Sequence, residues 1–280
     1  MKAQFPTEQS ETGEFQRQED TFREWISNDG STPYPAVAGR YHLYVSLACP
    51  WATVLSFRST DPINGFHYLS EAYAATDPSF DGRVTVPVLW DKEAKKIVNN
   101  CEDDICRMFN DAFDAVAQNK DVDLFPKEIE DEHIKLADFV YENVNNGVYK
   151  AGFATRQGPY EISCQKLFKA LDKLEARLSK SRYLFDKRIV EADWRLFCTL
   201  VRFDVVYHGH FKCNIRRIID YPNLQGYMMD LYQQPGIAET VNFDHIMRHY
   251  YMTHTEINPT RIVPIGPALD LTKVHRREKM

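Results

Sequence analysis

The residue best suited to chemistry is Cys49, which lies where a predicted strand gives way to a predicted helix. Residues 41–47 alternate and are rich in aromatic and β-branched side chains, as in a strand, and Pro50 suits the first position of a helix. The free N–H groups at such a helix start carry partial positive charge, which favours a thiolate. We therefore predict that Cys49 is a nucleophile. The alternative is an inert buried thiol, which we expect for the other five cysteines.

Cys49 has no second thiol close to it in the sequence. A Cys-x-x-Cys motif would need a cysteine at position 52, where Ala52 stands. A redox cycle at Cys49 would therefore have to take its second thiol from a small molecule.

The histidines do not form a metal-binding pattern. His245 and His249 fall on one face of a predicted helix, and His208 and His210 alternate. No cysteine or carboxylate is grouped with them at the spacing of metal ligands, so we expect no metal.

A second β region follows the one that leads to Cys49. Residues 83–90 and 96–99 read as two strands joined by a charged turn, and a helical pattern begins after Asn100. Pro87 cannot donate to a sheet ladder. Either the run is therefore an edge strand, or Pro87 marks the start of a strand and the peptide bond before it is unusual, for example cis.

The second half of the chain is helical in its periodicity. A polar stretch over residues 114–126 separates it from the β region and predicts a domain boundary. Leucines at positions 167, 171, 174 and 178 place an apolar stripe on one helix face. Three prolines predict an extended tail over residues 258–267. The predicted helices cover residues 134–144, 167–178, 194–206, 224–232 and 243–252.

Composition excludes several classes of protein. The net charge of −6 offers no basic face for nucleic acid, and no apolar run approaches the roughly 20 residues of a membrane helix. The start of the chain lacks the apolar stretch of a signal peptide. Six scattered cysteines do not form a secreted disulfide framework. We therefore expect a cytoplasmic protein with reduced thiols and with no nucleic acid or membrane partner.

Together these elements resemble a known family. A strand, Cys-Pro, a helix and then a strand containing Val86-Pro87 are typical of a thioredoxin-like domain, and a helical second half makes the chain resemble a glutathione transferase. Several motifs are similar to those of the glutathionyl-hydroquinone reductases, the Xi class of these transferases, from about residue 39 to the end. They are residues 39–52 (GRYHLYVSLACPWA), 82–92 (GRVTVPVLWDK), 145–154 (NNGVYKAGFA), 191–197 (EADWRLF), 210–214 (HFKCN) and 257–267 (INPTRIVPIGP).

The resemblance implies a fold class of α/β plus all-α in two domains. Residues 40–113 would form the thioredoxin-like domain, after an N-terminal arm over residues 1–39. Residues 127–280 would form the helical transferase domain with its extended tail. Family members usually pair through the helical domain, so the resemblance also implies a homodimer.

The resemblance further implies an oxidoreductase-type thiol transfer. Cys49 would attack the glutathione sulfur of a glutathionyl-hydroquinone, and a second glutathione would resolve the mixed disulfide. Glutathione is then a co-substrate, and no metal is needed. Tyr149 falls on the family's proton donor, while Tyr207 and Tyr250 fall on the tyrosines that help to activate the thiol and line the aromatic substrate pocket.

The implied glutathione site departs from the family pattern. Val86, before the cis proline Pro87, would pair with the glutathione backbone. Cys101 and Glu102 replace the Glu-Ser pair that holds the γ-glutamyl group. Glu102 would repel its carboxylate, and Asp103 and Asp104 add to the negative charge. Two alternatives therefore stay open: these residues only begin a helix, or the protein is a non-catalytic binding or interaction protein with a degraded glutathione site.

Two further departures concern the scaffold. A crossover after Cys49 needs a dozen or more residues, yet no second strand is evident before residue 83. The sheet is then one strand short, or the transcript has lost an exon after Arg58. Val190 stands where transferases of this fold carry a Ser or Thr that caps the helix starting at Glu191, a loss of about 1 kcal/mol.

Overall fold

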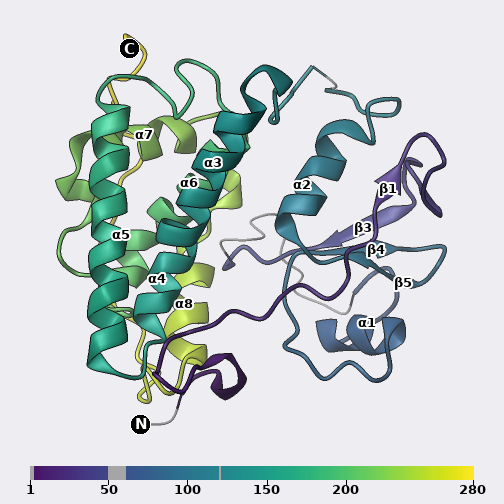
Figure 1. Cartoon of the computed structure of the whole chain (residues 1–280), viewed down its shortest axis with the longest axis horizontal. Helices are drawn as coiled ribbons and strands as arrows, with labels where there is room; N and C mark the ends of the chain where they lie inside the picture. The colour runs from purple at the N-terminus through teal and green to yellow at the C-terminus, as the bar shows by residue number, and fades with distance from the viewer. Residues whose placement is uncertain (1–2, 50–60, 120) are drawn as a thin grey trace. The chain divides into compact units, whose positions relative to one another are not determined.

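The computed structural model describes residues 3–49, 61–119 and 121–280 (Figure 1). The chain forms two compact units. One consists of residues 18–125, and the other combines residues 1–17 with residues 126–280. The first 17 residues therefore belong to the helical half of the protein.

The unit of residues 18–125 is built on a three-stranded antiparallel sheet of order β3-β4-β5. The strands are β3 (Tyr41–Tyr44), β4 (Val88–Asp91) and β5 (Lys96–Asn99). The predicted strand before Cys49 and the predicted hairpin are thus confirmed. Pro87 directly precedes β4 and the Val86-Pro87 peptide is cis, so the second interpretation of this proline holds.

Alternation along the strands gives the sheet two apolar faces, each covered by one helix (Figure 1). The helices are α1 (Leu69–Thr76) and α2 (Glu102–Asp111). On the α2 face, Leu89 and Val98 pack with Ile105 and Met108. On the α1 face, the buried residues are Tyr44, Ala72, Tyr73, Val88, Trp90 and Ile97.

The described residues between β3 and β4 hold α1 and no strand. A separate parallel pair, β1 (Ile26–Ser27) and β2 (Tyr34–Pro35), lies before the sheet in sequence. The sheet around Cys49 therefore has three strands within the described residues. The helix predicted to begin at Pro50 lies outside them.

The helical unit follows the predicted periodicity closely. The predicted leucine stripe, which includes Leu167 and Leu171, is buried along its whole length. The helices are α3 (Glu130–Val140), α4 (Asn146–Gly152), α5 (Gln157–Leu178), α6 (Glu191–Arg202), α7 (Pro222–Tyr232) and α8 (Phe243–Thr253). Short 3₁₀ turns are η1 (Pro6–Glu8), η2 (Lys127–Ile129), η5 (Ile218–Asp220) and η6 (Ala238–Thr240).

Two of the predicted helices contain a π-helical turn. η3 (Tyr141–Asn145) joins α3 to α4, and η4 (Phe203–Tyr207) continues α6. The Asn145 amide donates to Thr199 Oγ1 at 2.6 Å and so ties η3 to α6. Such turns rotate the residues that follow and are frequent at functional sites.

The start of α6 lacks the predicted cap oxygen, since Val190 makes no side-chain hydrogen bond there. Asp193 stabilises this end instead. Its carboxylate accepts from the N–H groups of Val190 and Leu184, both at 2.9 Å, and from the Tyr227 hydroxyl at 2.8 Å. Complete burial raises the pKa of Asp193 to about 6.

The C-terminal residues 254–280 contain no helix or strand, as the prolines predict for their first part. Arg277 is nonetheless buried, and its guanidinium donates to the carbonyls of Leu178 at 3.0 Å and Arg182 at 2.8 Å. It therefore fastens the tail to the C-terminal end of α5, whose last carbonyls have no partner within the helix.

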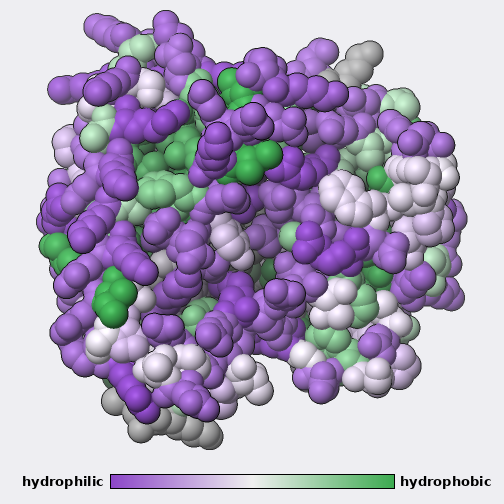
Figure 2. Space-filling model, in the orientation of Figure 1, coloured by the Kyte–Doolittle hydropathy of each residue, from purple (hydrophilic) through white to green (hydrophobic). Residues whose placement is uncertain are grey.

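One face of the surface is mostly hydrophilic, as expected for a chain without a long apolar run. Hydrophilic residues predominate on the face shown in Figure 2, and hydrophobic residues occur there in separate patches. Within the described ranges, the helices all lack the combination of length and apolar character that a membrane crossing needs.

Candidate active site

Cys49 lies in a tight turn just after β3. Its backbone N–H donates to the Ser46 carbonyl at 3.1 Å, and the Ala48 N–H donates to Ser46 Oγ at 3.3 Å. The side chain is half-buried, and all six cysteines of the chain carry thiols rather than disulfides. Because the residues after Cys49 lie outside the described part, the effect of a helix start on its thiol stays a prediction.

Three tyrosines meet at their hydroxyl groups in the helical unit. Tyr149 on α4 and Tyr250 on α8 have their oxygens 2.6 Å apart, and Tyr207 at the end of η4 lies 3.0 Å from the same Tyr250 oxygen. These are the three tyrosines that the resemblance selects. We call them the tyrosine cluster.

The cluster is shielded from water to different degrees. Tyr149 is 8% exposed, whereas Tyr207 and Tyr250 are 0% and 1% exposed. Burial raises the pKa of Tyr207 well above its ordinary value, so this hydroxyl stays protonated. Tyr149 is therefore the member best able to meet a substrate, with the other two hydroxyls behind it.

One neighbour of Tyr149 is not evident from the sequence. The Arg17 guanidinium lies over the Tyr149 ring, with Cζ 4.9 Å from the ring centroid. Its Nε donates to Asn146 Oδ1 at 3.0 Å. Arg17 comes from the N-terminal segment, which the sequence analysis treats as an arm, and no local motif marks it.

Three histidines have ring contacts with Tyr250, namely His210, His249 and His254. The rings of His254 and Tyr250 have centroids 5.4 Å apart, and His254 Nδ1 lies 3.2 Å from His210 Nε2. Burial lowers the pKa of His210 to about 4 and also lowers the pKa of His249. His210 and His249 are therefore neutral at neutral pH and add no charge to the tyrosines.

The cis peptide before Pro87 lies next to a polar anchor. Tyr73 on α1 donates through its hydroxyl to the Thr85 carbonyl at 2.9 Å, and the Asn100 amide donates to the same hydroxyl at 3.3 Å. Val86 is half-buried and Pro87 is buried. The chain that leads into the cis peptide is thus held to α1 and to the residue before Cys101.

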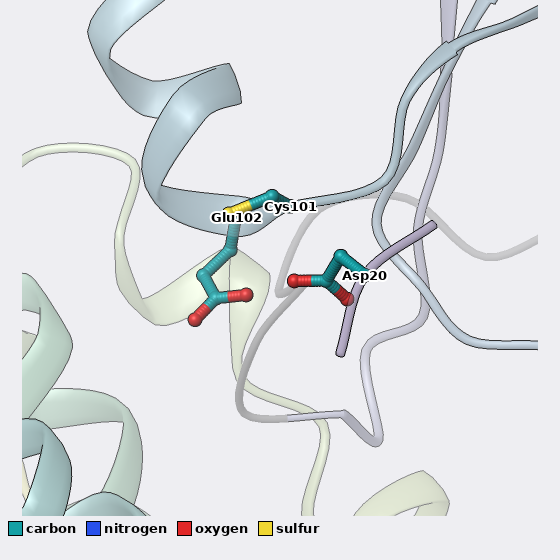
Figure 3. A group of neighbouring side chains, drawn as sticks. All are labelled: Asp20, Cys101 and Glu102. Carbon is teal, nitrogen blue, oxygen red and sulfur yellow. The ribbon is translucent and has the colours of Figure 1, made fainter. Parts of the chain in front are cut away.

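Cys101 and Glu102 lie at the start of α2, where Asp20 joins them as a second acidic residue (Figure 3). The Cys101 sulfur and one carboxylate oxygen each of Glu102 and Asp20 lie within 4.8 Å of one another. We call these three residues the acidic cluster. Burial, with the charges of Glu102, Asp104 and Asp20, raises the pKa of Cys101 to about 12. A thiol held protonated in this way is a poor metal ligand and a poor nucleophile.

The neighbouring acidic residues have arginine partners. Asp104 is bound by the Arg23 guanidinium, with Nη2 to Oδ1 at 2.8 Å, and Asp103 pairs with Arg107 at 3.0 Å. These pairs offset part of the negative charge expected from Asp103 and Asp104, while the Asp104 charge still contributes to the raised pKa of Cys101. The structure adds Asp20, a residue that the sequence analysis missed because it lies some 80 positions away in the chain.

Comparison with known proteins gives consistent matches over most of the chain. Residues 149–228 match the family model described as glutathione S-transferase, C-terminal domain. The chain is 45% identical to glutathionyl-hydroquinone reductase YqjG of Escherichia coli, over 95% of this chain and 93% of that protein. It is 42% identical to glutathionyl-hydroquinone reductase PcpF of Sphingobium chlorophenolicum, over 94% and 92%.

Solved structures give the same result. The glutathione-bound structure of E. coli YqjG has a TM-score of 0.87 at 44% identity and covers 92% of this chain and 96% of that one. Glutathione S-transferase Xi from Phanerochaete chrysosporium has a TM-score of 0.88 at 43% identity, with 92% and 94% covered.

The comparison with E. coli YqjG also bears on the missing strand. It extends over 306 aligned positions, whereas this chain has 280 residues. The alignment takes in 95% of this chain, about 266 of its 280 residues, so about 40 positions, 306 minus 266, hold a residue in the relative and none here. A difference of this size is consistent with the loss of a segment from this chain. That the segment is lost after Arg58 stays a prediction.

Proposed function

The chain belongs to the glutathionyl-hydroquinone reductases, the Xi class of glutathione transferases, and on that premise we propose that it reduces glutathionyl-hydroquinones with glutathione as co-substrate. The observation that carries this proposal is the tyrosine cluster. Tyr149, Tyr207 and Tyr250 lie far apart in sequence but join their hydroxyls in the fold. A flat ring with a hydroxyl donor suits an aromatic substrate that must receive a proton.

In the proposed first step, the Cys49 thiolate attacks the glutathione sulfur of the substrate. The carbon–sulfur bond breaks and its electron pair stays on the ring carbon, which takes the proton of the Tyr149 hydroxyl. The products are the hydroquinone and a mixed disulfide between Cys49 and glutathione. In the second step, the thiolate of another glutathione attacks that disulfide, releases Cys49 and forms oxidised glutathione.

The remaining site residues take supporting parts in this proposal. Tyr207 and Tyr250 line the aromatic substrate pocket from behind Tyr149 and return a proton to Tyr149 through their shared hydrogen bonds. The backbone of Val86, before Pro87, pairs with the glutathione backbone. Cys101 and Glu102 occupy the position next to its γ-glutamyl group.

A second candidate function rests on the acidic cluster. Asp20 and Glu102 place two carboxylates where the γ-glutamyl carboxylate would lie, and like charges at this range repel. A chain that no longer holds glutathione would be a non-catalytic binding or interaction protein. Retention on immobilised glutathione favours the enzyme, and flow-through of the folded protein favours this alternative.

We also propose how the chain is organised and where it works. The thioredoxin-like domain covers residues 40–113 and the helical domain covers residues 127–280. Residues 1–39 are an arm, of which residues 1–17 pack with the helical unit and residues 18–39 with the unit that holds the sheet. The protein forms a homodimer through its helical domain and works in the cytoplasm, where reduced glutathione is available. Sedimentation analysis tests this proposal, because a homodimer should have twice the mass of a single chain.

The decisive test is turnover of a glutathionyl-hydroquinone model compound by the purified protein. Release of one hydroquinone and one glutathione disulfide for each glutathione consumed is expected. Cys49→Ser should abolish this activity, and Cys106→Ser, a matched change at an exposed thiol of the same unit, should retain it. If Cys49→Ser keeps the wild-type rate, the nucleophile is misassigned.

A further inference from the structure

We propose that Arg17 is a positioning residue for the proton donor: its guanidinium orients the Tyr149 ring and stabilises the phenolate that remains after the proton has been given to the substrate. The inference rests on the proposed function, in which Tyr149 is the acid. It assigns a part in that reaction to the N-terminal segment, which comes before the whole thioredoxin-like domain in the sequence.

The contacts of Arg17 fix its position relative to α4. Its Nε donates to Asn146 Oδ1 at 3.0 Å, while Cζ lies 4.9 Å from the centroid of the Tyr149 ring and 5.9 Å from that of Phe15. Asn146 and Tyr149 are three residues apart and thus share one face of the helix. The guanidinium therefore contacts both Asn146 and Tyr149 on that face and limits rotation of the Tyr149 ring.

The charge of Arg17 acts on the ionised ring more strongly than on the neutral one. A cation over a neutral aromatic face is held by the ring quadrupole, whereas a cation beside a phenolate also gains a direct charge–charge attraction. A contact of this kind changes an equilibrium by roughly threefold to thirtyfold. Loss of the proton from Tyr149 should therefore be easier with Arg17 in place.

Among the described residues, the groups packed on the rest of the cluster place their charge elsewhere or carry none. On α8 and after η4, His249 and His210 have lowered pKa values and are neutral, and His254 is hydrogen-bonded to His210. On α6, the charge of the buried Arg202 acts on Tyr207, at the other end of the hydroxyl chain, where it offsets part of the rise in pKa that burial causes. The three hydroxyls are coupled, so the first proton is lost by the cluster as a whole.

The test compares Arg17→Met, which removes the charge but keeps an unbranched side chain, with Arg17→Lys, which keeps the charge. The pH profile of kcat is measured with a glutathionyl-hydroquinone. In Arg17→Met the plateau should fall about tenfold and the alkaline limb should move to higher pH by about one unit, because the acid is weaker. Arg17→Lys should stay within about threefold of the wild type.

A matched control separates this effect from a general loss of charge. Arg248→Met removes a guanidinium from α8, the helix of Tyr250, where Arg248 is exposed and pairs with Asp244. It should leave both plateau and limb unchanged. A merely structural role of Arg17 would lower the plateau without moving the limb, and that result would overturn the proposal.

A second measurement does not depend on turnover. Ultraviolet difference titration follows phenolate formation in the resting protein, and Arg17→Met should shift upward in pH the tyrosine transition that Tyr149→Phe alone removes. The shift should vanish when Tyr149→Phe is also present. If the wild type has no activity, the proposed function fails but this titration still decides the role of Arg17. An unshifted titration overturns the inference even if the enzyme turns over.

Discussion

The hydroxyl oxygens of Tyr149 and Tyr250 lie 2.6 Å apart, although 101 positions separate the two residues in the chain. Tyr250 also lies 3.0 Å from the Tyr207 hydroxyl and is thus the middle member of the cluster. A hydroxyl donates one hydrogen bond and accepts others, so such a chain can pass a proton along it. The helical unit alone therefore assembles the acid side of the proposed reaction.

The first prediction concerns the acid itself. Tyr149→Phe should lower turnover of a glutathionyl-hydroquinone by roughly a hundredfold to a thousandfold, because the ring carbon loses its proton donor. Tyr160→Phe is a suitable control, since the Tyr160 hydroxyl donates to the Lys212 carbonyl in the same unit, outside the cluster. Wild-type turnover in Tyr149→Phe would show that another group is the acid.

The second prediction concerns the thiols. At neutral pH an alkylating reagent should modify Cys49 fastest, as a thiolate, and Cys101 very slowly, because burial raises the pKa of Cys101 to about 12. Burial also raises the pKa of Cys164. Peptide mass spectrometry over time measures each rate. If Cys49 reacts no faster than the exposed Cys106, it is an ordinary thiol and the proposed mechanism fails.

The third prediction concerns the acidic cluster. Glu102→Ser should tighten glutathione binding by roughly threefold to tenfold, because it removes a negative charge close to the γ-glutamyl carboxylate. Glu93→Ser is the matched control, since Glu93 lies exposed in the β4–β5 turn of the same unit and pairs with Arg40. Calorimetry gives both dissociation constants. Equal values for wild type and Glu102→Ser would remove the charge argument.

The fourth prediction concerns pH and stability. The folded pKa of His210, about 4, lies below its ordinary value of 6.5. Between these values the unfolded chain binds the proton and the folded one does not. Stability is therefore complete above about pH 6.5 and falls as the pH drops toward 4, by up to about 3 kcal/mol from this group.

Denaturant unfolding at several pH values measures this effect. His210→Phe keeps a flat ring beside Phe211 and removes the titrating group, so its free energy of unfolding should change less between pH 6.5 and 4 than that of the wild type. The same slope in both proteins would show that His210 is not responsible.

Local patterns in the sequence were enough to predict most of the strands and helices of the scaffold. Alternation predicted β3 and the β4–β5 hairpin, and the leucine spacing predicted α5, because burial of one face imposes those periods. The same patterns could not reveal η3 and η4. A π-helical turn inserts one residue into a helix without changing its composition, so its position depends on contacts such as Asn145 with Thr199.

The site was predictable only in part, and for a different reason. Resemblance to a family selected Tyr149, Tyr207 and Tyr250, while composition alone gave no reason to choose them among 15 tyrosines. Arg17 and Asp20 were missed. Each acts through a contact made across a long stretch of chain, with Tyr149 and with Glu102, and no spacing in the sequence records such a contact.

The division of the chain into units has a consequence for its synthesis. Residues 18–125 form an uninterrupted stretch and can fold as soon as they leave the ribosome. Residues 1–17 emerge earlier but belong to the helical unit, whose residues 126–280 are made only after residues 18–125. The segment that carries Arg17 must therefore wait for its packing partners while more than a hundred residues are translated.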